Sequence, residues 1–362
     1  MSISEIDLFV PGRVCLLGEH SDWAGGYRRM DSSLTKGYCL VVGTDQGINA
    51  RARAHPDKVI IRSTLPDGKI VGPYEIELKM DALLRVAAEG GFFSYSAGVA
   101  AYVVNHYHVG GLEVNNYRMT LPIRKGLSSS AANNVLITRA FNRIYDLKLT
   151  LRGEMEVAYQ GEILTPSRCG RMDQACAYAK TPVYLIFDGD RLTVQPIYPQ
   201  KPIYMVIADL CAGKNTQRIL ADLNACFPKT LGKISEDVRY YLGPVNKDIV
   251  FRGCELLQNG DAERLGALMT EAQRLFDLLI APACLDELRS PQLHSVLEHP
   301  RVMPLIYGGK GVGSQGDGSV QLIARGQEEQ KTLMQVLREI RCEPYPLTIE
   351  AKADSDAEKS VN

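Results

Sequence analysis

The segment Leu121–Asn133, LPIRKGLSSSAAN, constrains the fold of this chain most strongly. Residues 117–121 alternate apolar and polar side chains, as a half-buried strand does, and residues 131–147 repeat apolar side chains at helical spacing. A glycine turn between a strand and a helix lets unpaired N–H groups point at one small volume, where the helix dipole also attracts anions. The segment therefore predicts a phosphate-binding loop, although it lacks the Gly-Lys-Ser/Thr of the Walker pattern. An ordinary serine N-cap is the alternative.

Composition limits the class of protein without identifying a function. With 362 residues the chain is long enough for two domains and a large core. Its formal net charge of -1 gives no general attraction to nucleic acid or to anionic membranes, so neither is expected as a partner. No apolar run has the length of a membrane helix, and the first residues lack the pattern of a signal peptide. Nine cysteines at irregular spacings suit reduced thiols, so we expect a cytoplasmic globular protein. No pattern indicates an oligomeric state.

Two halves with different patterns follow one another along the chain. Pro196 and Pro202 bracket a short polar segment, after which a strongly apolar strand begins. We therefore expect one domain over residues 1–198, a second over 199–345, and a polar, disordered tail over 346–362. A hairpin is expected over 175–197, with Asp188-Gly189 at its turn.

The segment 11–27, PGRVCLLGEHSDWAGGY, runs from an expected strand into a glycine-rich turn. It places Glu19, His20 and Asp22 within four positions, with Arg13 upstream. Such a cluster suits a ligand with several hydroxyl groups, because each hydroxyl needs a directional donor or acceptor. A polar loop with an Asx turn at Asp22 is the alternative.

Two carboxylates lie in the segment 161–174, GEILTPSRCGRMDQ. Glu162 falls on an expected helix, and Asp173 follows a glycine turn. One carboxylate could hold Mg²⁺ while the other accepts a proton from a hydroxyl nucleophile, which are two requirements of phosphoryl transfer. A helix-surface position for Glu162 and a helix cap at Asp173 are the alternatives.

The order and spacing of these segments resemble the GHMP kinase superfamily over roughly residues 8–340. PGRVCLLGEHSDWAGGY and GLSSSA resemble the galactokinase forms of two of its motifs, and GRMDQ is similar to the Gly-x-Met-Asp-Gln segment of galactokinases. The resemblance implies an α+β fold of two domains. The N-terminal domain would be ribosomal protein S5 domain 2-like and the C-terminal domain ferredoxin-like, with the active site in the interdomain cleft.

The resemblance also implies a role for each matching residue. Asp173 would accept or orient the proton of the acceptor hydroxyl, and Arg13 would stabilise charge on the transferring phosphoryl group. Ser130 and Glu162 would hold Mg²⁺. The residues implied to contact the phosphates of ATP are Lys125, Gly126, Leu127, Ser128, Ser129 and Ser130. Those implied to bind sugar hydroxyls are Glu19, His20 and Asp22.

The chain departs from the superfamily pattern at several positions. Arg28, Arg29 and Arg171 stand where galactokinases are apolar, and a guanidinium binds carboxylates bidentately. We therefore expect Arg28 and Arg171 to bind an acidic group of the substrate, or else to point outward or bind nucleotide phosphate. The glycine-rich loop Gly308–Ser319 carries Asp317 where glycine is usual, and a carboxylate near a triphosphate is unfavourable unless it faces a cation or the sugar.

These observations predict an enzyme, a Mg²⁺- and ATP-dependent kinase. The expected reaction transfers the γ-phosphoryl group of ATP to the anomeric hydroxyl of a monosaccharide, a galactose-like hexose or a hexuronic acid. A mevalonate- or inositol-type alcohol kinase is one alternative. A catalytically silent ATP and sugar sensor on the same fold is the other.

Overall fold

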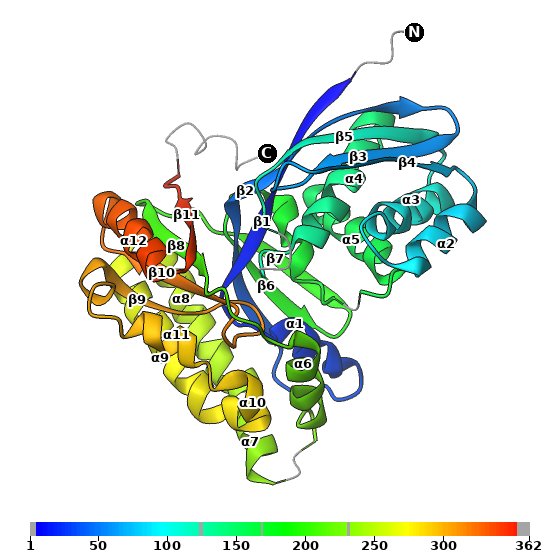
Figure 1. Ribbon diagram of the computed structural model, residues 1–362. Helices are drawn as coiled ribbons and strands as arrows, with labels where there is room; N and C mark the ends of the chain where they lie inside the picture. The colour runs from blue at the N-terminus through cyan, green and yellow to red at the C-terminus, as the bar shows by residue number, and fades with distance from the viewer. Residues whose placement is uncertain (1–4, 123–125, 168, 230–231, 353–362) are drawn as a thin grey trace. The chain divides into compact units, whose positions relative to one another are not determined.

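The computed structural model describes residues 5–122, 126–167, 169–229 and 232–352, and has the α+β architecture predicted from the sequence (Figure 1). Among these residues, no helix is both long and apolar enough to cross a membrane.

The chain divides into two compact units. Unit 1 comprises Met1–Arg13 and Gly43–Lys180, and unit 2 comprises Val14–Val42 and Thr181–Asn362. This division groups the segment 14–42 with the second half of the chain, so it differs from the expected boundary between residues 198 and 199. That boundary stays a prediction.

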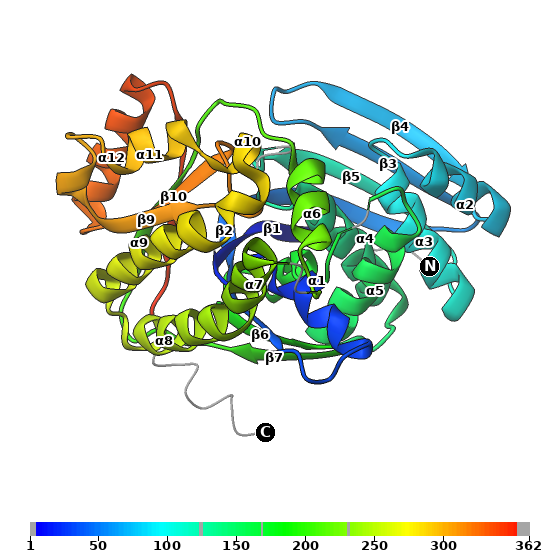
Figure 2. The same cartoon turned by 90° about the horizontal axis from the view of Figure 1, so that it is seen from below.

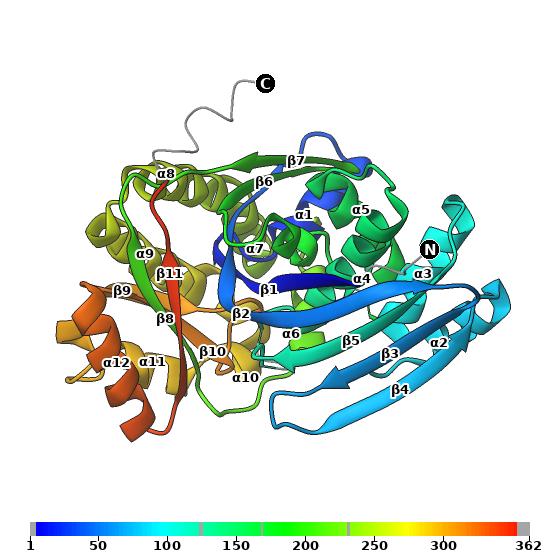
Figure 3. The same cartoon turned by 90° about the horizontal axis from the view of Figure 1, so that it is seen from above.

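Unit 1 is a sheet with helices on one face (Figure 3). Its strands run in the order β4-β3-β5-β2, in which β3 and β5 are parallel and the other pairs antiparallel. The strands are β3 (Lys58–Thr64), β4 (Ile70–Glu77), β5 (Gly111–Met119) and the second part of β2 (Gly37–His55). The helices are α2 (Met80–Glu89), α3 (Ser94–His106), α4 (Ser129–Tyr145) and α5 (Leu151–Ile163). Strand β1 (Ile6–Leu17), which carries Arg13, pairs with β2.

Helices α3 and α5 pack closely because two glycines face each other. A Cβ atom added to Gly98 would lie 2.2 Å from the carbonyl oxygen of Gly161, so neither position has room for a side chain. The residue after Gly161 is Glu162, which this close packing leaves 0% exposed. The 3₁₀ helix Asp173–Tyr178 follows α5 and carries the second predicted carboxylate.

Unit 2 contains a hairpin, an antiparallel sheet and the remaining helices. The hairpin β6 (Val183–Asp188) and β7 (Arg191–Pro196) pairs with the first part of β2. The sheet has the order β11-β8-β10-β9 and consists of β8 (Ile203–Asp209), β9 (Ile306–Gly311), β10 (Ser319–Ala324) and β11 (Glu343–Ile349). The helices are α1 (Ser21–Gly26), α6 (Thr216–Ala225), α7 (Lys233–Tyr240), α8 (Asn246–Asn259), α9 (Ala262–Leu279), α10 (Leu285–Leu288), α11 (Pro291–Leu297) and α12 (Gln327–Glu339).

The core of this sheet follows the two-residue period of its strands. Val206 and Ala208 of β8 share a buried cluster with Leu293 of α11 and Leu333 of α12, so these two helices cover one face. Helix α9 packs against β9, where a Cβ on Gly266 would lie 2.6 Å from the Tyr307 side chain. Helices α8 and α9 lie side by side (Figure 2).

Three local expectations need correction. Residues 175–178 belong to the 3₁₀ helix and not to the hairpin, whose two-residue turn is Gly189-Asp190. Residues 308–311 are strand β9, so only 312–318 form the glycine-rich loop. Residues 346–349 complete β11 and do not belong to a tail, because Leu347 and Ile349 are buried against the sheet. The expected disorder of residues 353–362 lies outside the described part of the chain.

The ion pair of Arg139 and Glu154 is a buried link that supports the site-bearing segments of unit 1. Arg139 of α4 donates to Glu154 of α5 at 2.8 Å and to the carbonyl oxygen of Ala177 in the 3₁₀ helix at 2.7 Å. Both charged side chains are at most 6% exposed.

We predict that Arg139→Met lowers the free energy of unfolding by about 3–5 kcal/mol, because Glu154 would remain buried without its cation. Urea denaturation measures the loss. Arg143→Met, one turn along the same helix at an exposed position, is the matched control and should change stability by less than about 0.5 kcal/mol. Equal losses in both variants would contradict the role of the buried pair.

Candidate active site

The predicted phosphate loop has a backbone that only glycine and a few strained residues adopt. Gly126 has φ 80° and Ser128 has φ 56°, both in the left-handed region, immediately before α4. The carbonyl oxygen of Leu127 accepts from the backbone N–H of Arg13 at 3.2 Å, and that of Gly126 accepts from Arg13 Nη1 at 3.3 Å. The C=O and N–H of one peptide point in opposite directions, so the next N–H groups point away from Arg13. N–H groups that point the same way at the start of a helix are the kind of backbone arrangement that binds anions.

Ser128 occupies the N-cap position of α4, yet its side chain makes no capping hydrogen bond. The alternative of an ordinary serine cap, in which the hydroxyl accepts from the first turn, is therefore wrong for this residue. Lys125, also predicted to contact phosphate, lies outside the described residues.

Arg13 connects the phosphate loop to Asp173. Its Nη2 donates to Oδ1 of Asp173 while its Nη1 donates to the carbonyl oxygen of Gly126. The Arg13 side chain is 6% exposed and that of Asp173 is 23% exposed, so the carboxylate keeps access to solvent at one side. The structure thus brings two predicted catalytic residues together, from positions 160 residues apart in the chain.

Glu162 is a buried carboxylate surrounded by neutral donors. Its Oε2 accepts from Asn134 at 2.9 Å and from Gln174 at 2.8 Å, and its Oε1 accepts from Ser167 at 3.2 Å. Ser130 also hydrogen-bonds to this carboxylate. Burial raises the pKa of Glu162, and the charge of Asp173 raises it further, while these hydrogen bonds act in the opposite direction.

This arrangement fits a magnesium ion. A buried carboxylate whose hydrogen-bond donors are all neutral, with a second carboxylate close enough to raise its pKa, is a site of uncompensated negative charge. Mg²⁺ is commonly held by one or two carboxylates together with waters and substrate phosphates, so Glu162 and Ser130 suffice as its protein ligands. Among the described residues, no group of three or more His, Cys, Asp or Glu side chains forms an all-protein metal cage.

The predicted sugar-binding residues follow β1 in unit 2. Glu19 and His20 are 4% and 5% exposed, and Asp22 is half-buried in the first turn of α1. His20 Nδ1 accepts from the indole N–H of Trp23 at 3.1 Å, and its ring stacks on Phe276 with centroids 6.3 Å apart. The Trp23 hydrogen bond defines the neutral tautomer, in which Nε2 carries the proton.

Two lysines that were not predicted lie beside this motif. Lys310 of β9 is 1% exposed, and its ammonium donates to Oε1 of Glu19 and to the carbonyl oxygen of Gly311. Lys214 follows β8 and donates to the carbonyl oxygens of Val312 at 3.3 Å and Gln315 at 2.8 Å. A possible signal for Lys310 was a lysine between glycines at the end of an apolar strand, whereas Lys214 had no local signal.

The glycine-rich loop is shaped around Lys214. A Cβ on Gly318 would lie 3.0 Å from the Lys214 ammonium and 2.7 Å from its Cε, so a side chain there would displace the lysine. Asp317 contacts a helix, because its Oδ1 accepts from the backbone N–H of Leu293 in the first turn of α11. The carboxylate is thereby stabilised by a helix N-terminus.

The two arginines predicted to bind an acidic substrate group have partners within the protein. Arg28 is paired with Asp188 and also donates to the carbonyl oxygens of Ser32 and Leu34. Arg171 lies 3.3 Å from Glu156, and its guanidinium stacks over Tyr159 at 4.8 Å. These contacts give both side chains a role in holding the fold, while their binding to substrate stays a prediction.

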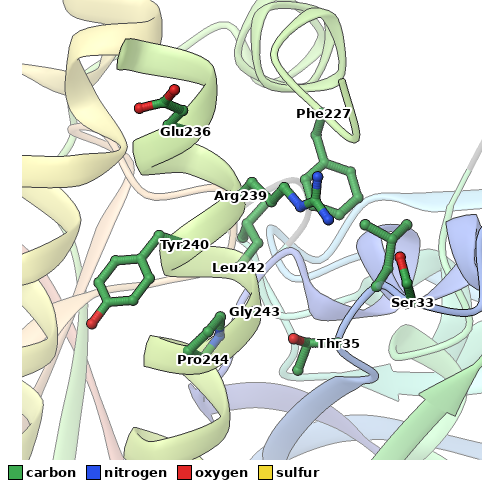
Figure 4. A pocket seen from close by; sticks show the side chains of 10 residues that line it. Ser33, Thr35, Phe227, Glu236, Arg239, Tyr240, Leu242, Gly243 and Pro244 are labelled. Carbon is green, nitrogen blue, oxygen red and sulfur yellow. The ribbon is translucent and has the colours of Figure 1, made fainter. Parts of the chain in front are cut away.

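A cavity of 370 Å³ lies elsewhere in unit 2, between helix α7, the following π-helix Tyr241–Val245 and the segment before β2 (Figure 4). None of the predicted site residues lines it. Its lining combines apolar and charged side chains, namely Ser33, Leu34, Thr35, Phe227, Glu236, Arg239, Tyr240, Leu242, Gly243 and Pro244.

Comparisons with known proteins agree with the motifs and the fold. Residues 94–180, which include the phosphate loop, Glu162 and Asp173, match the family model described as the GHMP kinases N terminal domain. The fold matches solved GHMP kinases over nearly the whole chain. Residues 94–180 therefore match a GHMP kinase N-terminal domain, as the motifs in this part of the chain predicted.

Particular relatives include several galactokinases. The chain is 25% identical to the galactokinase of Pyrococcus furiosus over 294 residues, which are 75% of this chain and 77% of that protein. It is 32% identical to the galactokinase of Clostridium acetobutylicum over 219 residues, 59% of this chain and 51% of the relative. Its structure resembles Lactococcus lactis galactokinase complexed with galactose, with a TM-score of 0.72 and 16% sequence identity. The match covers 96% of this chain and 94% of that chain. It also resembles Methanococcus jannaschii mevalonate kinase, with a TM-score of 0.71 and 17% sequence identity. That match covers 96% of this chain and 99% of the other.

We predict that Glu162→Gln removes a metal response of the protein. With a non-hydrolysable ATP analogue present, Mg²⁺ at ten times its dissociation constant should stabilise the wild type by about 1.4 kcal/mol and leave the variant unchanged. Without metal, the wild type should lose stability as pH rises from 4.5 to the raised pKa of Glu162, because the folded state binds more protons in that window. Denaturation curves at several pH values, with and without Mg²⁺, measure both effects. An equal Mg²⁺ response in the two proteins would rule out Glu162 as a ligand.

We predict an acid-sensitive stability that depends on His20. Its pKa is lowered to about 4 by burial and by the charges of Lys214 and Lys310. The unfolded state therefore binds more protons than the folded state between pH 6.5 and 4, so stability falls as pH decreases through that window. Between pH 7.5 and 5 the loss from this group is about 2 kcal/mol. His20→Phe keeps a ring stacked on Phe276 but cannot titrate. Denaturant unfolding should therefore show that its free energy of unfolding falls between pH 7.5 and 5 by about 2 kcal/mol less than that of the wild type. Parallel curves for the two proteins would contradict the assignment.

Proposed function

We propose that this protein is an ATP- and Mg²⁺-dependent kinase that phosphorylates the anomeric hydroxyl of a monosaccharide. The observation that carries the proposal is the connected cluster of unit 1, in which Arg13 joins the phosphate loop to Asp173 and Ser130 joins it to Glu162. Phosphoryl transfer needs such parts, namely a phosphate cradle, a cation site and a carboxylate for the nucleophile. The galactokinase relatives support a sugar as the acceptor.

In this proposal the residues act mainly by positioning and by charge. The N–H groups at the start of α4 bind the phosphate oxygens of ATP. Ser130 and Glu162 hold Mg²⁺, which when bound neutralises charge on the phosphates. Arg13 stabilises the charge that develops on the transferring group, and Asp173 orients the acceptor hydroxyl or accepts its proton.

Glu19, His20 and Asp22 would bind hydroxyl groups of the sugar. The neutral His20 has an N–H donor, and the carboxylates of Glu19 and Asp22 are acceptors. Directional hydrogen bonds to these groups could distinguish polyols by the orientation of their hydroxyl groups. All nine cysteines are free thiols, which supports the proposal of a cytoplasmic enzyme.

The alternatives have less support. A mevalonate-type kinase shares the fold, but the first motif has the galactokinase form, and the relatives that match by sequence are galactokinases. A silent sensor has no need for a carboxylate held beside the phosphate loop by a buried arginine. Sugar-dependent ADP release separates an enzyme from a sensor.

We predict that Asp173→Asn lowers kcat by about 10²–10⁴-fold, because the amide keeps the hydrogen bond to Arg13 but cannot accept the proton. ADP release measures the rate with a panel of free sugars, and NMR locates the phosphate on the product. Binding of a fluorescent ATP analogue should be retained. Asp190→Asn, at an exposed turn, is the matched control with unchanged kcat. If the wild type released no ADP with any sugar of the panel, the proposal would be wrong.

A further inference from the structure

Two ammonium groups share one carboxylate in the interior of unit 2. Glu19 is bonded to Lys310, and both side chains are at most 4% exposed. Glu19 is also the carboxylate whose charge acts on Lys214. Lys214 itself donates to two backbone carbonyl oxygens, which carry no net charge. His20 is neutral at pH 7 because burial lowers its pKa to about 4. The group formed by Glu19, His20, Lys214 and Lys310 therefore carries an excess of one positive charge.

Unsatisfied polar atoms lie against the same group. Gln315 is 1% exposed, and neither atom of its side-chain amide has a hydrogen-bond partner among the described residues. The amide oxygen would lie 2.1 Å from a Cβ on Gly311, so it is pressed against the residue next to Lys310. The His20 ring lies beside the same loop, because it hydrogen-bonds to the backbone of Ser314. Buried groups of this kind are normally satisfied, so the Gln315 amide has hydrogen-bonding capacity that a ligand could use.

Lys214 differs from Lys310 in its exposure, since Lys214 is half-buried and Lys310 is buried. The Lys214 ammonium is surrounded by the loop 312–318, whose Gly318 leaves room for it. Burial lowers the pKa of Lys214 to about 8, and the charge of Glu19 acts in the opposite direction. An anion that bound there would replace the solvation that the ammonium has lost.

We propose that Lys214, together with Gln315, binds the carboxylate of a hexuronic acid, so that the acceptor of the kinase is a sugar acid. This inference rests on the proposed function, since it names the class of acceptor for that reaction. A carboxylate carries one negative charge, which matches the single excess positive charge, whereas a phosphate group carries more. Arg28 and Arg171 already have carboxylate partners from the protein, so Lys214 and not an arginine is the selective cation.

Calorimetry and kinetics with D-glucuronate, D-galacturonate, D-glucose and D-galactose test the proposal. For the wild type, kcat/KM for one uronate should exceed that for its parent hexose by at least about tenfold. Lys214→Met should raise KM for that uronate by at least about tenfold, with kcat and the hexose KM little changed. Lys331→Met, at an exposed position of α12, is the matched control and should leave kcat and KM unchanged for both the uronate and the hexose.

Gln315→Leu provides a second test if Lys214→Met fails to fold. It deletes an amide that makes no hydrogen bond within the described structure, so the variant should keep the stability of the wild type while uronate affinity falls. Equal losses for uronate and hexose in either folded variant would overturn the inference.

Other outcomes separate the two proposals. Phosphorylation of a hexose with no binding of either uronate would overturn the inference and leave the kinase in place. Another outcome is that calorimetry detects uronate binding that requires Lys214, while no sugar causes ADP release. This outcome would support the inference about the ligand and contradict the proposed reaction. Binding of inorganic phosphate at Lys214 with no uronate binding would assign the cation to the nucleotide and overturn the inference.

Discussion

The site in unit 1 depends on one guanidinium group. Arg13 donates to the carbonyl oxygen of Gly126 and to the carboxylate of Asp173, which lie 113 and 160 residues away in the sequence. Because both donors belong to one planar group, the loop that would cradle phosphate and the acid that would face the nucleophile keep a defined distance. The backbone N–H of the same arginine also holds Leu127, so the loop is anchored to strand β1 at two points.

Each unit contains a charge imbalance that a ligand would relieve, and the two imbalances have opposite sign. In unit 1 the carboxylate of Glu162 has neutral donors and a second carboxylate nearby, which suits a cation. In unit 2 the ammonium of Lys214 donates to backbone carbonyl oxygens, while Glu19 is paired with Lys310. This arrangement suits an anion. Unpaired buried charge lowers the stability of the free protein, but it provides preorganised electrostatic interactions for a substrate.

The local structure of unit 1 could be predicted well from the sequence, because its signals are local. Helical periodicity over residues 131–147 predicted α4 to within a few residues, and the glycine and serines predicted the turn before it. Residues 308–311 of β9 and 346–349 of β11 were not predicted as strands, since each strand depends on partners far away in the chain. β11 carries Pro344 and Pro346, which are tolerated because this strand is at the edge of its sheet.

The sequence by itself determined the chemical inventory of the protein, namely a glycine-serine turn, an arginine and two carboxylates in an order typical of GHMP kinases. Only the tertiary structure decided how those charges are compensated. It paired Arg13 with Asp173, occupied Arg28 and Arg171 with protein carboxylates, and enclosed Lys214 and Lys310 beside the sugar motif. The physical reason is that the effect of a charge depends on burial and on neighbours within a few ångströms, which long-range folding supplies and residue spacing does not.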